Sequence, residues 1–75
     1  MKKQTYIAYF KDENDNLVTF ERFTCKGLKR VVSCVKDLLN SELYMICVKG
    51  TKTVEIYATP DGYHIELVPE YILVV

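Results

Sequence analysis

The segment TCKGLKRVVSCVKDLLN, residues 24–40, decides the fold because the spacing of apolar residues changes within it from two to about 3.6. At about 100° per residue, its apolar side chains share one helical face: Leu28, Val31, Val32, Val35, Leu38 and Leu39. The other face carries the polar ones: Lys29, Arg30, Ser33, Lys36, Asp37 and Asn40. Thr24 is the expected N-cap, and Phe23 with Leu28 forms the expected hydrophobic staple. Asn40 is the expected end of this amphipathic helix.

Runs rich in β-branched and aromatic residues flank the predicted helix on both sides. Before it, residues 4–11 and 17–23 are separated by the polar turn DENDN, which predicts a β-hairpin. After it, turns at KGTK and TPDG separate three further runs, at residues 43–49, 53–58 and 63–68. These runs predict a three-stranded meander.

The carboxyl-terminal segment EYILVV, residues 70–75, follows Pro69, which is expected to end the last strand of the meander. Exposed chain ends are usually polar, so an apolar tail is expected to be held against another part of the protein. We expect a further short strand, paired either in its own sheet or on a neighbouring chain.

The order of these elements is ββαβββ, and it predicts an α+β fold. One amphipathic helix packed on one face of a mostly antiparallel sheet buries the apolar surfaces of both. The 75 residues are expected to form a single small domain, residues 1–75. A core of this size rarely supplies more than about 3–5 kcal/mol, so self-association, in the simplest case a homodimer, is expected.

Composition limits the functions that this chain can perform. Ten acidic residues balance ten basic ones, so the long-range positive field of most nucleic-acid binders is missing. The amino terminus lacks the apolar core of a signal peptide, and no stretch approaches the ~20 apolar residues of a membrane span. Three cysteines without paired spacing indicate free thiols in a reducing compartment. The chain is therefore expected to be cytoplasmic, with no membrane partner.

The start of the predicted helix concentrates positive charge. Lys26, Lys29 and Arg30 lie on or next to its first turn, where cations oppose the helix dipole by about 0.3–1 kcal/mol each, and Lys36 follows them on the polar face. A bound phosphate, a nucleic acid or an acidic partner would remove this conflict. The turn lysines at positions 49 and 52 would extend such a surface. The alternative is an ordinary solvated face, because Gly27 belongs to no recognised phosphate loop.

The cysteines allow two further interpretations. Cys25 at the helix start could be a reactive thiolate, but a nucleophile needs a positioned base and the chain has one histidine. Cys25, Cys34, Cys47 and His64 lack the short paired spacing of zinc ligands, so neither a metal nor another cofactor is expected. Cys34 at the edge of the apolar helix face and Cys47 beside Met45 are instead expected to act as small core hydrophobes.

The last hairpin suggests a polar cluster. If it closes symmetrically on Pro60 and Asp61, the pattern directs these residues to the core: Val54, Ile56, Ala58, Tyr63, Ile65 and Leu67. Tyr57 is then paired with His64, and Glu55 with Glu66, on the opposite face. Such a face could bind a partner, or it could be solvated, with a Lys or Arg of the first hairpin nearby. Acid/base chemistry would also need a cleft with shifted pKa values.

Six tyrosines and three phenylalanines exceed what one small core must hold, so some are expected to be exposed. The expected function is a non-enzymatic protein-interaction module, or a small accessory or inhibitor protein that docks on a partner or on itself. Small accessory proteins of phage and mobile elements have this size, which is an association only. The expected contacts are Glu55, Tyr57, His64, Glu66 and Tyr71. The alternatives are a nucleic-acid-binding domain that uses the basic helix face and, last, a thiol or acid/base enzyme.

Overall fold

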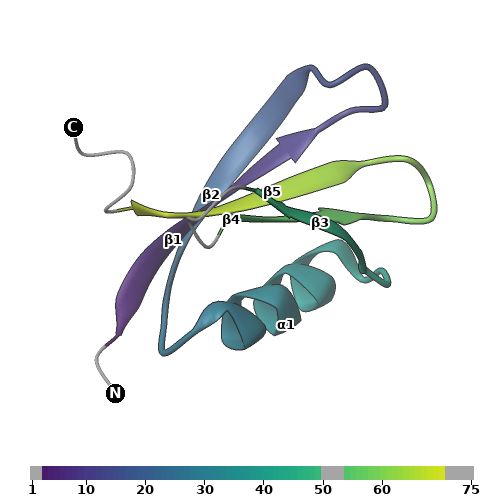
Figure 1. Ribbon diagram of the computed structural model, residues 1–75. Helices are drawn as coiled ribbons and strands as arrows, with labels where there is room; N and C mark the ends of the chain where they lie inside the picture. The colour runs from purple at the N-terminus through teal and green to yellow at the C-terminus, as the bar shows by residue number, and fades with distance from the viewer. Residues whose placement is uncertain (1–2, 50–53, 71–75) are drawn as a thin grey trace.

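Five strands and one helix follow one another as ββαβββ in the computed structural model, which describes residues 3–49 and 54–70 (Figure 1). The elements are β1 (Gln4–Lys11), β2 (Leu17–Cys25), α1 (Leu28–Leu39), β3 (Tyr44–Lys49), β4 (Val54–Ala58) and β5 (His64–Pro69). The predicted α+β class, the element order and the position of the helix on one face of the sheet are confirmed.

The strands form one antiparallel sheet in the order β2-β1-β5-β4-β3. Pairing of β1 with β5 joins the first hairpin to the meander, although these two strands stand near opposite ends of the chain. As a result β2 and β3, which flank the helix in sequence, lie at the two opposite edges of the sheet. The chain crosses from one edge to the other through α1, which lies over one face (Figure 1).

The main core lies between α1 and the sheet. Val31 and Val35 of the helix are fully buried, and they belong to the same cluster as Ala8, Ile65 and Leu67. Burying such an aliphatic side chain stabilises a fold by about 1.5–3 kcal/mol. The predicted helix face is confirmed except at Leu38, which remains 56% exposed.

A second apolar row lies on the face away from the helix. Ile7 is paired with Val68 in the sheet, and both are buried although they point away from α1. Val54 is buried as well. The face that the sequence pattern assigned to polar residues is therefore partly apolar.

The helix begins later than expected. Thr24 belongs to β2, opposite Thr5, with the two hydroxyl oxygens 3.1 Å apart, so the predicted Thr24 cap is wrong. Pairing with β1 extends the strand to Cys25, and the N-cap is Gly27, without a side-chain capping hydrogen bond. The predicted end is confirmed. Asn40 takes the left-handed conformation at φ 50°, and the N–H of Ser41 donates to the carbonyl of Lys36, as in a Schellman motif.

The last strand ends at Pro69, as expected. Pro69 is the last residue of β5, is paired with Tyr6 and is buried. A proline is tolerated there because a terminal strand position needs no further ladder donor. The predicted strand at residues 70–75 lies, beyond Glu70, outside the described residues.

Candidate protein interface

The β4–β5 hairpin turns over three residues, Pro60, Asp61 and Gly62. Thr59 donates its backbone N–H to the carbonyl of Tyr63 at 2.9 Å, which closes the loop. Gly62 has φ 98°, a conformation that side-chain-bearing residues rarely adopt, and a glycine in this place is typical of three-residue hairpin loops. The sequence pattern assumed a two-residue loop centred on Pro60 and Asp61, so the true register is displaced by one residue.

This displacement divides the predicted polar cluster between the two faces. Tyr57 is paired with Ile65 and Glu55 with Leu67, on the side that α1 covers. His64 and Glu66 are paired with Ala58 and Ile56, on the other side. The prediction that Glu55, Tyr57, His64 and Glu66 share one face is wrong, because a shift of one residue in a strand reverses the face of every side chain. The fifth predicted contact, Tyr71, lies outside the described residues.

Tyr57 and Glu55 form a local pair on the helix side. The Tyr57 hydroxyl donates to Glu55 Oε1 at 2.7 Å, and Tyr57 itself is buried. Burial, followed by the hydrogen bond to Glu55 and the charge of its carboxylate, raises the pKa of Tyr57 to about 12. A buried, protonated tyrosine of this kind supports the core and presents little surface to a partner.

Glu66 has a cation from the first hairpin beside it. Lys11 Nζ lies 3.8 Å from Glu66 Oε2 and 3.7 Å from Asp15 Oδ1. The expectation of a hairpin cation near this carboxylate is therefore confirmed. These three residues line a shallow pocket of about 230 Å³ together with Cys47 and His64. No hydrogen bond joins Cys47 to His64, both of which are described residues.

The basic helix start forms a second pocket, of about 280 Å³. Lys26 and Arg30 line it with Lys3, which the sequence pattern did not identify, and with the thiols of Cys25 and Cys34. Lys36 does not belong to it: its Nζ lies 3.7 Å from Glu42 Oε2, near the carboxyl end of α1. Lys29 is exposed and does not line the pocket either. The four predicted cations therefore do not form one surface. Residue 52 and the side chain of Lys49 lie outside the described parts.

The cysteines only partly follow the expectation of core hydrophobes. Cys25 is half-buried and packs against the core. Burial raises the pKa of the Cys25 thiol and the neighbouring Cys34 raises it further, while Arg30 and Lys3 oppose the shift. A raised pKa reduces the thiolate population that nucleophilic chemistry requires. Cys34 and Cys47 are exposed, so the prediction is wrong for both: Cys34 turns out of the helix interface, and Cys47 lies on an edge strand.

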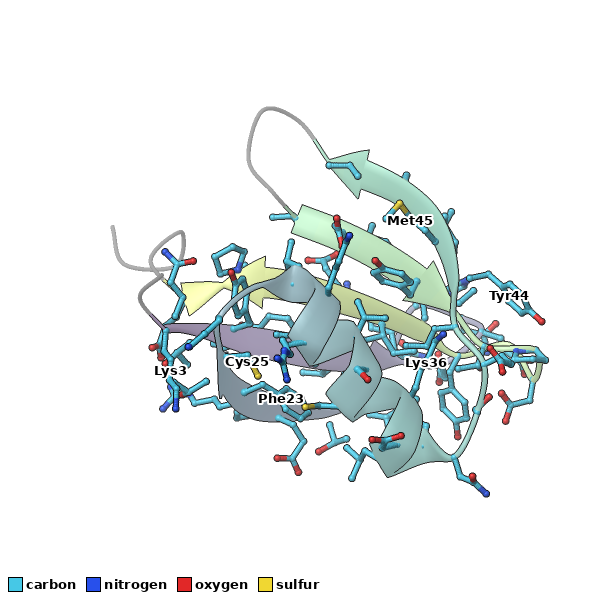
Figure 2. The ribbon with its side chains drawn as sticks, turned by 90° about the horizontal axis from the view of Figure 1, so that it is seen from below. Lys3, Phe23, Cys25, Lys36, Tyr44 and Met45 are labelled. Atoms are coloured by element: carbon cyan, nitrogen blue, oxygen red, sulfur yellow. The ribbon has the colours of Figure 1, made fainter. Side chains whose placement is uncertain are left out.

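The edge strand β3 is the most exposed apolar element among the described residues. Tyr44, Met45, Ile46 and Val48 are 58%, 53%, 53% and 51% exposed, and Cys47 between them is exposed too. The helix packs on β1 and β2, and Figure 2 shows β3, with Tyr44 and Met45, extending beyond the area that α1 covers. Tyr44 bears out the expectation of exposed tyrosines. No charged residue interrupts the strand from Tyr44 to Val48.

The opposite edge strand, β2, differs from β3 in carrying features that oppose pairing with another chain. Strand β2 exposes Val18 and Phe20, but Phe20 packs on Tyr9 of β1 with ring centroids 6.2 Å apart. Glu21 and Arg22 follow on the same strand and are exposed. Charges on an edge strand discourage pairing with another chain, and β3 has none in its first five residues. Between the β2 edge and the helix lies an apolar groove of about 280 Å³, lined by Phe10, Val18, Thr19, Glu21, Leu38, Leu39 and Tyr63.

The sequence pattern missed β3 as a surface. Its run LYMICV carries neither a charge nor a strict alternation, which is typical of a strand buried on both faces. The same run on an edge strand is exposed. One local feature of the sequence could have indicated this surface: the strand without charges follows directly after the helix that connects the two edges of the sheet.

Among the described residues, no three His, Cys, Asp or Glu side chains lie together in a way that could hold a metal ion. No helix of the described parts is long and apolar enough to cross a membrane. The chain matches no protein-family model, and neither a curated protein nor a solved structure is found to be similar to it.

Proposed function

We propose that this chain is a non-enzymatic protein-interaction module of the cytoplasm, which binds an extended apolar protein segment along the open edge of β3. The observation that carries the proposal is the exposure of Tyr44, Met45, Ile46 and Val48 on an uncharged edge strand. In a cell such a protein would act as a small accessory or inhibitor protein, by occupying a segment of its partner.

Strand addition supplies both affinity and selectivity at such an edge. Within residues 3–49 and 54–70, no strand lies beside the outer side of β3. Each hydrogen bond that its outer backbone N–H and C=O groups gain is worth about 0.5–1.5 kcal/mol. Side chains on the two faces of β3 then select the segment. Met45, paired with Tyr57, extends the helix-side core, while Tyr44, paired with Ala58, extends the other face. An added apolar strand would continue both layers.

Two single substitutions, one on each edge strand of the sheet, test the proposal. Ile46→Lys puts a charge on β3, and Val18→Lys puts the same charge on β2 at a site of similar exposure, 56% against 53%. We expect tagged wild-type protein and the Val18→Lys variant to retain a protein partner, its own chain included, and the Ile46→Lys variant to lose it. Hydrogen exchange on the recovered complex should show new protection of the β3 amides.

Two results would contradict the proposal. One is equal retention of the partner by Ile46→Lys and wild type, with both variants folded by circular dichroism. The other is a complex in which exchange of the β3 amides is unchanged, which would move the interface to the apolar groove at Val18 and Leu38 or elsewhere.

A further inference from the structure

We propose that Cys25 and Cys34 form a redox-responsive pair of thiols. The oxidant is a small disulfide that carries carboxylates, of the chemical class of oxidised glutathione. It reacts first with Cys34, and Cys25 then completes a disulfide with Cys34. This proposal goes beyond the proposed function of β3, because the two thiols belong to the basic pocket beside β2, at the opposite edge of the sheet.

The fold brings these two thiols together from different elements. Cys25 is the last residue of β2 and Cys34 belongs to α1, and both line the same pocket of about 280 Å³. Figure 2 shows Cys25 beside the helix. Burial, and then the charge and the side-chain hydrogen bond of Cys34, raise the pKa of the Cys25 thiol, so the two groups interact directly. Cys47 lies on β3, which three strands separate from β2.

The two thiols differ in accessibility, and this difference sets the order of reaction. Cys34 is exposed, whereas Cys25 is half-buried and packs against the core. Attack on a disulfide requires an accessible thiolate, so Cys34 reacts first. Burial continues to raise the pKa of Cys25 afterwards, but a Cys34 in a mixed disulfide carries no charge that raises it further. The first step therefore makes Cys25 more reactive toward the second.

The cations of the pocket select the oxidant. Lys3, Lys26 and Arg30 line it, and none of the described residues that line it is acidic. Arg30 and Cys34 are four residues apart in α1, which makes them neighbours on one side of the helix. Carboxylates on a small disulfide are attracted to these cations, which raises the concentration of the oxidant next to Cys34. A disulfide that carries positive charges is repelled.

Two thiol–disulfide exchange steps account for the atoms and electrons. The Cys34 thiolate attacks one sulfur of the small disulfide, its S–S bond breaks, and one half leaves and takes up the proton that Cys34 lost. The Cys25 thiolate then attacks the Cys34 sulfur, and the second half leaves with the proton of Cys25. The two cysteines lose two electrons in total, and the small disulfide is reduced to two thiols. Excess small thiol reverses both steps.

The first experiment oxidises the reduced full chain with oxidised glutathione and follows it by mass spectrometry after acid quenching. Trypsin cleaves after Lys26 and Arg30, so the two cysteines end in one product only where a disulfide joins them. Wild type should pass through a mixed disulfide at Cys34 to an intrachain Cys25–Cys34 disulfide, and Cys25→Ser should stop at the mixed disulfide. In Cys34→Ser, thiolation of Cys25 should be at least about tenfold slower than that of Cys34 in wild type.

The second experiment changes the charge of the oxidant. Lys26→Gln with Arg30→Gln should slow thiolation of Cys34 by oxidised glutathione about three- to tenfold. It should not slow thiolation by cystamine, a small disulfide with two positive charges. Lys29→Gln is the matched control, because Lys29 is exposed on the same helix but does not line the pocket, and it should leave both rates unchanged. Circular dichroism establishes that the variants fold.

Each contrary result overturns one part of the proposal. If oxidised wild type keeps the mixed disulfide at Cys34, or forms disulfides only between chains, Cys25 and Cys34 are not a redox pair. If the double variant slows both oxidants equally, or Lys29→Gln slows oxidised glutathione as much, the pocket does not select an anionic disulfide. None of these results bears on β3, so they leave the proposed function standing.

Discussion

Tyr57 donates a hydrogen bond of 2.7 Å to Glu55, two residues earlier on β4, and both side chains lie on the face of the sheet that α1 covers. Residues two apart in a strand point to the same face, so this contact follows from the strand itself. The three-residue loop at Gly62 decides that this face is the inner one.

The first prediction concerns alkaline pH. Because the pKa of Tyr57 is raised to about 12 from 10.0, folding favours its neutral form. The resulting stability is complete below about pH 10 and is lost as pH rises toward 12. Spectrophotometric titration of wild type should show a late-ionising tyrosine component that is missing in Tyr57→Phe. Glu55→Gln, which keeps an acceptor and removes the charge, should lower the pKa of Tyr57. Simultaneous ionisation of all six tyrosines in the folded protein would contradict this.

The second prediction concerns the thiols. Alkylation of the folded protein, followed by mass spectrometry, should modify the exposed Cys34 and Cys47 before Cys25. Burial and the neighbouring Cys34 raise the pKa of Cys25, so its reaction should accelerate only at a pH above the ordinary value of 9.0. Arg30→Gln should slow Cys25 further, because Arg30 lowers this pKa. In denaturant all three should react alike; preferential labelling of Cys25 in the folded chain would reverse the order expected here.

The third prediction concerns the helix start. Gly27 is an N-cap in an extended conformation, at φ 172°, and a Cβ added there meets no atom within 4 Å. Gly27→Asp should therefore raise the free energy of unfolding by about 0.5–1 kcal/mol, through a capping hydrogen bond, the helix dipole and a less flexible unfolded chain. Gly27→Ala is the control that lacks the cap. Urea unfolding that ranks the alanine variant equal to or above the aspartate variant would disprove a capping effect.

The fourth prediction concerns nucleic acid. Of the cations that the structure describes, Lys3, Lys26 and Arg30 line the basic pocket. Lys36 is paired with Glu42, and the chain carries no net charge. We expect no measurable complex with single- or double-stranded DNA or RNA at physiological salt. A tight complex that weakens steeply with salt would support the nucleic-acid alternative. Lys26→Glu with Arg30→Glu should then abolish it, and Lys36→Glu should not.

Local features were predictable because they depend on neighbours in the chain. The apolar face of α1 and the end at Asn40 follow from helical periodicity and from the left-handed conformation that asparagine tolerates. The start was less predictable: the sequence pattern selected Thr24, but pairing with Thr5 on β1 keeps this residue in a strand. A contact between segments far apart in sequence outweighed a local capping preference.

The sequence by itself determined the type and order of the elements that the structure describes, because the spacing of apolar residues reflects the geometry of each backbone segment. The tertiary structure alone decided which strands lie at the edges of the sheet and which side chains share one of its faces. Pairing of β1 with β5 places β3 at an edge and exposes Ile46, and the conformation of Gly62 shifts one register and separates Glu55 from Glu66. Both outcomes depend on hydrogen bonds between strands. The spacing of apolar residues within a single strand does not determine which strand it pairs with or in which register.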